Sequence, residues 1–331
     1  MEATKLKTLV IVRHEVEQLL DVNEALQAVE GAFKLKSQGK SIMPAKIYLN
    51  IPEYQGDYRA MPAYINGIAG LKWVSTYPNN RQYNLPNVMA TIILSDPDTG
   101  YPLAIMDGTY ITAIRTGVAG GIAAKYLARK GSSIIGVIGA GRQAETQLLA
   151  IAAVLPEINE VKVFDQYSEI GIRYAIKMTA KLNVKISSVE TISEAAESDI
   201  LVTTTPSREP IIRKQYVKPG THINAIGADA KGKQELDPDL LASAKIIVDD
   251  IEQACHSGEI NVPLSKKQIS IDNIYGTLGE VITGTKKGRE NEQEITIFDS
   301  TGLAIQDMIC AQLVYEKAMK KNNSTYTYFN S

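Results

Sequence analysis

The sequence predicts an α/β protein with two parts: a doubly wound parallel sheet of the Rossmann type, and an α+β domain built on an antiparallel sheet. Three observations support this prediction. An apolar run at 134–138 leads into a glycine-rich turn and then a helical pattern. After this turn, short apolar runs alternate with helical patterns, as in parallel sheets. Before it, between residues 46 and 107, short strand patterns are separated by Pro, Gly and Asn, as in an antiparallel meander.

The elements before the glycine-rich turn follow from spacing and turn residues. Residues 8–12 predict a strand. Asp21, with Glu24 three positions later, has the spacing of a capping box at the start of a helix that carries Phe33 on its apolar face. Five strands are expected at 46–51, 58–64, 68–76, 88–95 and 101–107, with a turn at 96–100. Residues 108–129, rich in Ala and Gly, predict a long helix suited to close packing.

The stretch Gly139-x-Gly141-x-x-Ala144 is the most informative part of the chain. Glycine lets the backbone turn tightly and approach a pyrophosphate, and the N-terminus of the next helix offers free N–H groups and a positive dipole end. A second strand pattern at 161–165 ends in Asp165, 21 residues after Ala144. A carboxylate there accepts the ribose hydroxyls of NAD and repels the 2′-phosphate of NADP. We weigh this against an ordinary βα turn with an incidental Asp, and predict an NAD site.

The alternation of strands and helices continues towards the end of the chain. Strands at 184–186, 200–204, 221–226 and 245–248 bring the parallel set to six, as in a doubly wound dinucleotide fold. Residues 294–298 are expected to add an edge strand, 302–320 a final helix, and 321–331 a polar tail that frays or docks weakly. We therefore place a substrate-binding and dimerisation domain at 1–118 with 303–331, and a Rossmann NAD-binding domain at 119–302.

Composition argues against several other classes of protein. With 331 residues, 44% hydrophobic and 22% charged, the chain is typical of a globular protein long enough for two domains. A net charge of −2 gives no reason to expect nucleic acid or an anionic membrane as a partner. The sequence has no run of about 18 apolar residues and no signal-peptide pattern, so we expect the cytoplasm. Cys255 and Cys310 lack the spacing of a zinc site or a disulfide framework.

Four cations at expected strand or helix positions are candidates for holding an anionic substrate: Lys46, Arg59, Lys72 and Arg115. Lys72 is also the candidate for proton transfer, because its neighbours Leu71 and Trp73 indicate a buried or half-buried strand. Desolvation there lowers the pKa of a lysine towards neutrality. The alternative for Lys72 is a stem that extends to solvent with its ammonium paired. For Lys46, Arg59 and Arg115 the alternative is a surface or structural ion pair.

Polar residues at the ends of later strands are further candidates. Asp229 follows the strand at 221–226, at the carboxyl end where open α/β sheets bind ligands, and could orient an ammonium or activate water. The alternative is a turn or capping aspartate. Thr203-Thr-Thr-Pro206 would place hydroxyls beside the adenosine or ribose. Ser300 is expected to start the last helix and close over the nicotinamide, or to be its N-cap.

Histidine and metal chemistry are not expected. Three histidines are poor candidates for a direct role, as surface, packed or turn residues: His14, His222 and His256. No spacing of His, Cys, Asp or Glu indicates a metal centre.

Several longer runs carry a resemblance. They include Arg59-Ala-Met-Pro62, Gly70-Leu-Lys-Trp-Val74, Arg115-Thr-Gly117, 120–129, 201–208, 222–229, 232–237, 258–262 and 298–307. Over nearly the whole chain these runs resemble the ornithine cyclodeaminase/mu-crystallin family, and most closely its archaeal-type alanine dehydrogenase branch. Runs of this length are far more specific than the glycine motif.

The resemblance implies a homodimer joined through the antiparallel domains, NAD on the Rossmann domain, and a small amino-acid substrate bound between the domains. It implies that Lys72 donates and accepts the proton, that Lys46, Arg59 and Arg115 bind the substrate carboxylate with it, and that Asp229 faces the amine or the attacking water. The residues expected to contact the cofactor are Asn87, Arg115, Thr116, Gly139, Ala140, Gly141, Arg142, Gln143, Asp165, Thr204, Thr205, Pro206, Ile226, Gly227, Asp229, Lys233 and Ser300.

Branches of this family differ in the fate of the imine formed when the Cα hydride passes to NAD. Hydrolysis of the imine gives a reversible NAD-dependent alanine dehydrogenase, which forms pyruvate and ammonia. We favour this reading, because Lys46 and Arg59 add positive charge that suits a short substrate. Attack by the substrate's own δ-amine instead gives an ornithine cyclodeaminase, which forms proline and ammonia with NAD as a catalytic cofactor. A cyclic-imine (ketimine) reductase and a ligand carrier like mu-crystallin are further alternatives.

Two residues depart from the patterns expected in the family. Lys46 stands where many members carry arginine, although it matches the alanine dehydrogenase pattern, and Asn87 stands where we expect threonine. Arg142, beside Asp165 in the glycine turn, could soften the preference for NAD over NADP.

Overall fold

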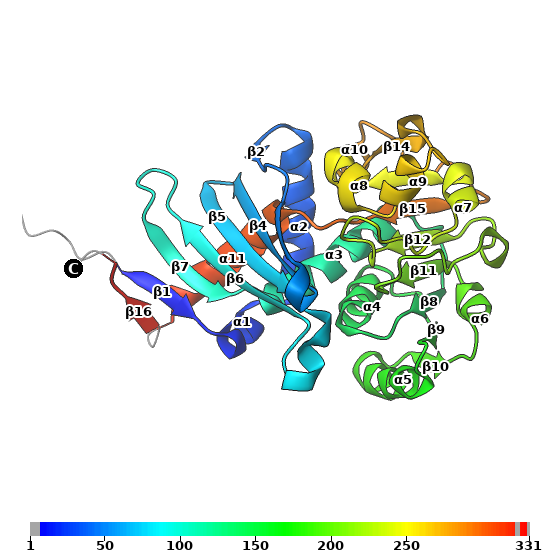
Figure 1. The fold of residues 1–331 in the computed structure, drawn as a ribbon, viewed down its shortest axis with the longest axis horizontal. Helices are drawn as coiled ribbons and strands as arrows, with labels where there is room; N and C mark the ends of the chain where they lie inside the picture. The colour runs from blue at the N-terminus through cyan, green and yellow to red at the C-terminus, as the bar shows by residue number, and fades with distance from the viewer. Residues whose placement is uncertain (1–6, 322–324, 330–331) are drawn as a thin grey trace, which may run out of the picture. The chain divides into compact units, whose positions relative to one another are not determined.

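The computed structural model describes residues 7–321 and 325–329, and their contacts divide the chain into two compact units. Unit 1 comprises Met1–Arg115 with Leu303–Ser331, and unit 2 comprises Thr116–Gly302. Unit 1 contains a largely antiparallel sheet and unit 2 a parallel sheet (Figure 1). The predicted fold class is therefore confirmed.

Unit 1 is built on an eight-stranded sheet in the order β16-β1-β7-β6-β5-β4-β2, with β3 also paired to β4. Neighbouring strands are antiparallel except β1 and β7, which are parallel. The strands are β1 (Thr8–Ile11), β2 (Ser41–Ile42), β3 (Ile47–Ile51), β4 (Gly56–Ile65), β5 (Ile68–Thr76), β6 (Val88–Ser95), β7 (Pro102–Asp107) and β16 (Thr325–Thr327). The helices are α1 (Arg13–Leu19), α2 (Val22–Ser37), the first part of α3 (Thr109–Leu127) and α11 (Ala304–Ala318).

One face of this sheet forms the core of unit 1. The register pairs Met61 of β4 and Ile92 of β6 with Lys72 of β5, so these three side chains lie on the same face, and all three are buried. α11 packs on this face against β4, β5 and β6, and lies behind the sheet in the view of Figure 1. α2, which packs against α11, begins as predicted at its N-cap Asp21.

Unit 2 is a doubly wound fold around an eight-stranded parallel sheet in the order β10-β9-β8-β11-β12-β15-β13-β14. The strands are β8 (Ile134–Ile138), β9 (Glu160–Phe164), β10 (Lys185–Ser188), β11 (Ile200–Thr203), β12 (His222–Ala225), β13 (Lys245–Val248), β14 (Ile274–Thr277) and β15 (Thr296–Asp299). The helices are α4 (Arg142–Val154), α5 (Ser168–Leu182), α6 (Ile192–Ala196), α7 (Pro238–Ser243), α8 (Ile251–Ser257), α9 (Asn261–Ser265) and α10 (Leu278–Ile282), with the second part of α3.

The strand order of unit 2 reverses at β8. From β8 the chain builds outward through β9 and β10, then returns to place β11 on the other side of β8. The carboxyl ends of β8 and β11 therefore form the topological switch point, where open α/β sheets bind their ligands. The glycine-rich turn lies at this point, because it directly follows β8.

The glycines of α3 explain its close packing in unit 2. A Cβ added at Gly117 would lie 2.4 Å from the backbone of Thr146, and one added at Gly121 would lie 2.9 Å from the backbone of Ala150, both in α4. α3 and α4 therefore approach to a distance that side chains at these positions would prevent. This is the close packing that the Ala- and Gly-rich sequence predicted.

Two expectations about the later elements were wrong. Residues 294–298 were expected at an edge, but β15 lies between β12 and β13 and is buried on both faces, as is typical of central parallel strands. The edge strand on this side of the sheet is β14, which has no alternating pattern and contains Gly276. The tail was expected to fray or dock weakly, and in its described part β16 pairs with β1, while residues 322–324 and 330–331 lie outside the described part of the chain. Ser300 does not start the last helix, because α11 begins at Ala304 after the N-cap Leu303.

No helix within residues 7–321 and 325–329 has both the length and the apolar character needed to cross a membrane.

Candidate active site

A buried lysine is the central feature of unit 1. Lys72 is only 1% exposed, and its Nζ lies 2.7 Å from Oδ2 of Asp307. Arg115 reaches the same carboxylate from α3, with its Nε 2.9 Å from Asp307 Oδ1, and also donates to Gln306 Oε1 at 3.2 Å. Lys72, Arg115 and Asp307 come from three distant parts of the chain. They place two cations around one anion inside the protein.

Burial controls the protonation of this lysine. Removal of the ammonium from water lowers the pKa of Lys72 from 10.5 to about 7, and the positive charges of Arg115 and Lys46 act in the same direction. Asp307 acts against them, because its negative charge and its hydrogen bond favour the protonated lysine. The burial expected from the flanking residues is confirmed. Lys72 can therefore take up or release a proton near neutral pH.

Two further cations lie near this lysine. Arg59 is buried on the same sheet face as Lys72, since it pairs in register with Val74 of β5, and its Nε lies 2.7 Å from Asp57 Oδ1. Its guanidinium also lies over the ring of Tyr48, 5.3 Å from the centroid. Lys46 is close enough for its charge to lower the pKa of Lys72. Of the predicted carboxylate-binding set, Arg59 and Lys72 thus share one face of the sheet, while Arg115 of α3 and Lys46 are close enough to act on the pKa of Lys72.

In unit 2, the turn after β8 has the backbone geometry of a phosphate site. Gly139 has φ +88°, a conformation that favours glycine, and Gly141 is the N-cap of α4 without a side-chain capping bond. A Cβ added at Gly141 would meet no protein atom within 4 Å. The first N–H groups of α4 therefore lack a capping side chain, as in helix termini that bind phosphate.

Asp165 is attached to this turn. One of its carboxylate oxygens accepts the N–H of Ala140 at 2.9 Å, and the other accepts the N–H of Tyr167 at 3.0 Å. The acid that ends β9 is therefore held beside the glycine turn. Its role with a ribose stays a prediction.

The ends of β11 and β12 meet the same turn through hydrogen bonds. Thr204 Oγ1 donates to Gly139 O at 2.8 Å, and a Cβ at Gly139 would lie 3.0 Å from the methyl carbon of Thr205. Glu235 joins Thr205 to Gly227 by accepting the N–H groups of both. Pro206 and Ile226 adjoin these residues in sequence, so the structure brings the predicted set at this edge together.

Other predicted residues of unit 2 have partners of their own. Asp229 Oδ1 lies 2.6 Å from Lys233 Nζ, which also donates to Gly227 O at 3.4 Å. Arg142 pairs with Glu145, which is also bound by Lys177. Gln143 accepts from Thr146 Oγ1, and Thr116 O accepts from Gln147 Nε2.

Two orphaned oxygens bear on whether the residues fit a dinucleotide. Within the described residues, Asn87 Oδ1 in unit 1 and Ser300 Oγ in unit 2 are buried and have no hydrogen-bond partner. Such a group costs about 1–3 kcal/mol, which a ligand that pairs with it would recover. Ser300, the glycine turn and Asp165 all belong to unit 2, and their polar groups suit those of NAD.

The prediction from sequence missed two acids. Asp307 was noted only as the end of a matching run, and Glu235 only inside another. A buried acid between the apolar residues Ile305 and Met308 of α11 was the available signal for Asp307, because such a charge needs a partner. Glu235 had no comparable signal.

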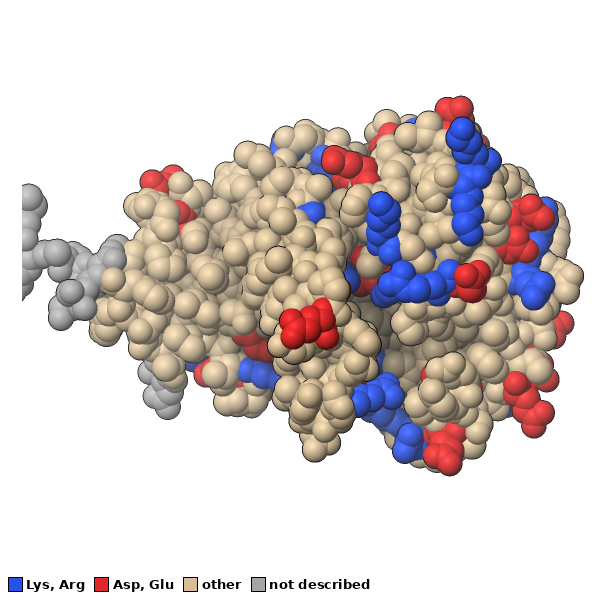
Figure 2. Space-filling model, viewed as in Figure 1, with Lys and Arg blue, Asp and Glu red and all other residues tan. Residues whose placement is uncertain are grey.

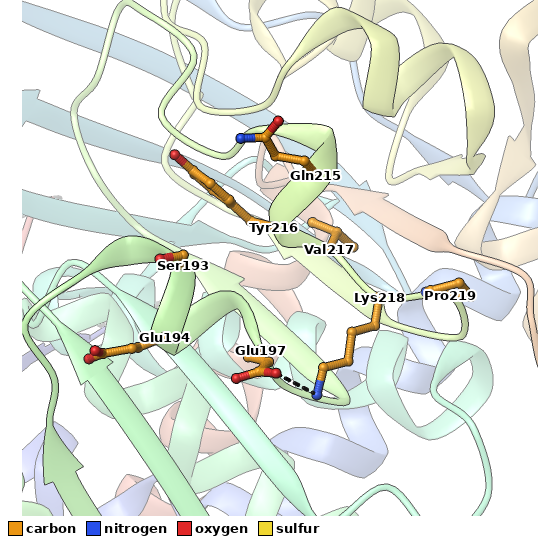
Figure 3. Close-up of a pocket in the computed structure, with 8 residues that line it drawn as sticks. All are labelled: Ser193, Glu194, Glu197, Gln215, Tyr216, Val217, Lys218 and Pro219. Carbon is orange, nitrogen blue, oxygen red and sulfur yellow. Dashed lines mark ion pairs between the residues drawn. The ribbon is translucent and has the colours of Figure 1, made fainter.

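A surface pocket of about 460 Å³ in unit 2 lies elsewhere (Figure 3). Figure 3 shows residues that precede β11 and β12 around it, with Lys218 paired to Glu197 at 3.6 Å. It is therefore at the amino ends of these strands, opposite the glycine turn, and contains none of the predicted site residues. Across the described residues, no group of three or more His, Cys, Asp or Glu side chains is arranged to hold a metal ion.

Comparison with known proteins agrees with this arrangement. A model of the ornithine cyclodeaminase/mu-crystallin family matches residues 6–322. The chain belongs to this family. The resemblance seen in the sequence is therefore confirmed.

Three matches, one from curated sequences and two from solved structures, are especially similar to this chain. The alanine dehydrogenase of Archaeoglobus fulgidus is 53% identical over 317 residues, 96% of this chain and 97% of the relative. A solved archaeal alanine dehydrogenase, a dimer with bound NAD, is 52% identical with a TM-score of 0.95, over 98% of this chain and 100% of that chain. The Thermococcus litoralis Delta(1)-pyrroline-2-carboxylate reductase in complex with NADH and L-proline is 41% identical with a TM-score of 0.93, over 96% and 99% of the two chains.

Proposed function

We propose that this chain is an NAD-dependent alanine dehydrogenase, which converts L-alanine, NAD and water reversibly to pyruvate, ammonium, NADH and a proton. The observation that supports this most is Lys72, a buried lysine with a pKa of about 7 beside Arg115 and Asp307. A protein that only carried a ligand would not need a buried proton donor. The similarity to alanine dehydrogenases over nearly the full chain supports the same reading.

Unit 2 would hold the cofactor. The N-terminus of α4 and the turn at Gly139–Gly141 suit its pyrophosphate, and Asp165 suits a ribose. When bound, NAD supplies the acceptor for the hydride that leaves the substrate Cα. Ser300, also in unit 2, would offer its unpaired oxygen to the polar groups of the cofactor.

Unit 1 would bind the substrate and handle its proton. Arg59, Lys46 and Arg115 supply positive charge for the carboxylate of L-alanine. Lys72 in its neutral form takes the proton that the substrate ammonium must lose before the Cα–H bond breaks, because the nitrogen lone pair then assists departure of the hydride. It returns a proton as ammonia leaves.

Asp229 would act on the water that hydrolyses the imine. Its carboxylate follows β12 and is held by Lys233 at 2.6 Å. A carboxylate fixed in this way can accept a proton from an attacking water or orient the substrate amine.

A second candidate function is a cyclic-imine reductase. It is favoured by the 41% identity to the Thermococcus litoralis reductase that was solved with NADH and L-proline. Such a reaction uses the same proton donor and the same hydride chemistry, but it needs no water and releases no ammonia.

The test is an assay of purified protein with NAD and, separately, L-alanine, L-ornithine or L-proline, with NADH and ammonia measured in each. The proposal predicts one ammonia per NADH from L-alanine. NADH from L-proline without ammonia would favour the reductase. Ammonia from L-ornithine without accumulated NADH would indicate a cyclodeaminase.

The outer face of the unit 1 sheet supports a homodimer. Its register places Ile47, Leu49, Trp73 and Ile93 on the face opposite Lys72, and they are 67%, 49%, 40% and 37% exposed. The surface over β4–β7 carries few charged side chains (Figure 2). Exposed apolar surface of this kind marks a protein–protein interface. We assign it to a second copy of the chain, as the NAD-bound relative is a dimer.

A further inference from the structure

Three buried acids form a connected series at the carboxyl edge of the unit 2 sheet. Asp299, at the end of β15, accepts the backbone N–H of Glu259 at 2.9 Å. Glu259 accepts the backbone N–H of Glu235 at 2.9 Å and that of Leu236 at 2.6 Å. Asp299 therefore fixes the backbone of Glu259, and Glu259 fixes the backbone of Glu235. The series ends at the side chain of Glu235.

The side chain of Glu235 joins the ends of two strands. Its carboxylate accepts four hydrogen bonds, all from uncharged donors: Thr203 Oγ1 at 2.7 Å, Thr205 N–H and Thr205 Oγ1 at 2.7 Å, and Gly227 N–H at 2.9 Å. Thr203 and Thr205 belong to the end of β11, and Gly227 follows β12. One side chain therefore fixes the distance between these two segments.

The packing around Glu235 leaves no room for a side chain at position 227. A Cβ added at Gly227 would lie 2.5 Å from Glu235 Oε2 and 2.2 Å from Thr205 O. Both distances are shorter than any real Cβ contact. The backbone at Gly227 therefore lies directly against the carboxylate, and its position depends on the shape and charge of that group.

A carboxylate in this position is costly. Glu235 is fully buried, and burial raises its pKa. Burial and the nearby charge of Glu235 also raise the pKa of Glu259. An apolar side chain would avoid this cost, but it could not accept from Thr205 and Gly227 together. The feature that only the carboxylate provides is the fixed geometry of the two segments.

These segments belong to the second half of the doubly wound sheet. In such folds the first half, here β8 to β10, carries the pyrophosphate turn and the first ribose, while the second half holds the other mononucleotide. Resting on the proposed NAD function, we propose that Glu235 is a positioning residue that sets the β11 and β12 ends for the nicotinamide half of the cofactor, without touching it. Loss of its carboxylate therefore weakens NAD while it spares ligands that contain only the adenine half.

Titration calorimetry measures the Kd of NAD and the Kd of ADP for the purified wild-type protein and for the purified Glu235→Gln variant. The glutamine amide has one acceptor oxygen where the carboxylate has two, so it cannot accept from Thr205 and Gly227 together. The NAD Kd therefore rises about tenfold or more, while the ADP Kd stays within about twofold. Equal weakening of both ligands would overturn the proposal, since it would indicate a general loss of structure. Unchanged NAD binding would overturn it as well.

A matched set of threonine variants makes the test independent of the folding of Glu235→Gln. Thr203→Val removes the donor to Glu235 and should raise the NAD Kd about threefold or more, whereas Thr203→Ser keeps the hydroxyl and should bind as wild type. The control is Thr221→Val, which loses a buried hydroxyl that donates to Ser198 O at 3.0 Å before β12 begins. It should lower stability without changing NAD binding. Identical NAD affinities for Thr203→Val and Thr203→Ser would contradict the proposal.

The two proposals fail in different ways. Wild-type protein that binds no NAD would refute the proposed function and the role of Glu235 with it. Wild-type protein that binds NAD and oxidises L-alanine, with unaltered affinities in Glu235→Gln and Thr203→Val, would refute only the role of Glu235.

Discussion

Lys72 has its ammonium removed from water and paired with Asp307, whose carboxylate also binds Arg115. Removing a charge from water is expensive, and here one carboxylate serves two cations. The balance brings the pKa of Lys72 to about 7, where both protonation states are populated at neutral pH. Burial of Lys72 therefore costs folding stability, and the lowered pKa that results suits this lysine to proton exchange.

Replacement of Lys72 separates chemistry from cofactor binding. Lys72→Met keeps the buried stem but removes the ammonium, so turnover of L-alanine should fall at least about 100-fold. The NAD Kd should change by less than about tenfold, because Lys72 lies in unit 1 and the glycine turn in unit 2. Steady-state kinetics and titration calorimetry on one preparation check both. Loss of NAD binding in this variant would count against the assigned role.

The pH dependence of activity tests the cause of the lowered pKa. In the oxidative direction Lys72 must be neutral, so kcat/KM should rise with pH through about 7 in the wild type. Asp307 raises the pKa of Lys72, so Asp307→Asn should move this rise to lower pH. The variant should also unfold more easily, by about 3–5 kcal/mol, because two buried cations lose their counter-charge.

Asp57→Asn is the matched control for this profile. It removes a carboxylate from Arg59 rather than from Lys72, so it should affect substrate binding and leave the midpoint of the rise unchanged. The explanation of the lowered pKa would be contradicted if the pH midpoint of kcat/KM is unchanged in Asp307→Asn. It would also be contradicted if this midpoint moves equally in Asp307→Asn and Asp57→Asn.

Single residues were predictable from sequence where the signal is local. Leu71 and Trp73 beside Lys72 indicated burial, and the glycine spacing indicated the turn before α4. Asp307 and Glu235 were not predictable in this way, because their roles come from contacts with residues far away in the chain. Nothing in the neighbours of Glu235 indicates that it accepts from both Thr205 and Gly227.

At the scale of elements, the packing of α3 on α4 depends on residues without side chains. Gly117→Ala should destabilise the fold by about 1–3 kcal/mol, because the new Cβ would lie 2.4 Å from the backbone of Thr146 and the helices must move apart. The matched change is Gly31→Ala in α2, where a Cβ meets nothing within 4 Å. It should stabilise by about 0.5–1 kcal/mol through helix propensity. Denaturant unfolding of both variants measures the difference, and equal effects would show that the α3–α4 contact is not tight.

Strands were predictable where alternation or flanking turns mark them. The strands expected at 68–76, 88–95 and 245–248 have the bounds observed for β5, β6 and β13. β15 was placed at an edge because sequence order suggests the next strand lies outside the last, whereas it inserts between β12 and β13. β14 and β16 are short, and their pairing is decided by tertiary contacts that sequence patterns do not contain.

At the scale of the whole molecule, the outer face of the unit 1 sheet predicts the assembly. Trp73 on this face stacks on Tyr58 with ring centroids 5.1 Å apart. Trp73→Glu places a charge in the proposed interface and should weaken the dimer at least about 100-fold, while Trp73→Phe should remain dimeric. Sedimentation velocity distinguishes the two. A monomeric wild type, or a Trp73→Glu variant as dimeric as wild type, would show that this face is not the interface.

Transfer of deuterium from L-alanine labelled at Cα, in the presence of NAD, is the most direct test of the proposed reaction. We expect NADH that carries the deuterium, pyruvate that lacks it, and one ammonia for each NADH. The same experiment on Lys72→Met should give no labelled NADH although NAD still binds. Unlabelled NADH, or no NADH from L-alanine in the wild type, would contradict the assignment of this chain as an alanine dehydrogenase.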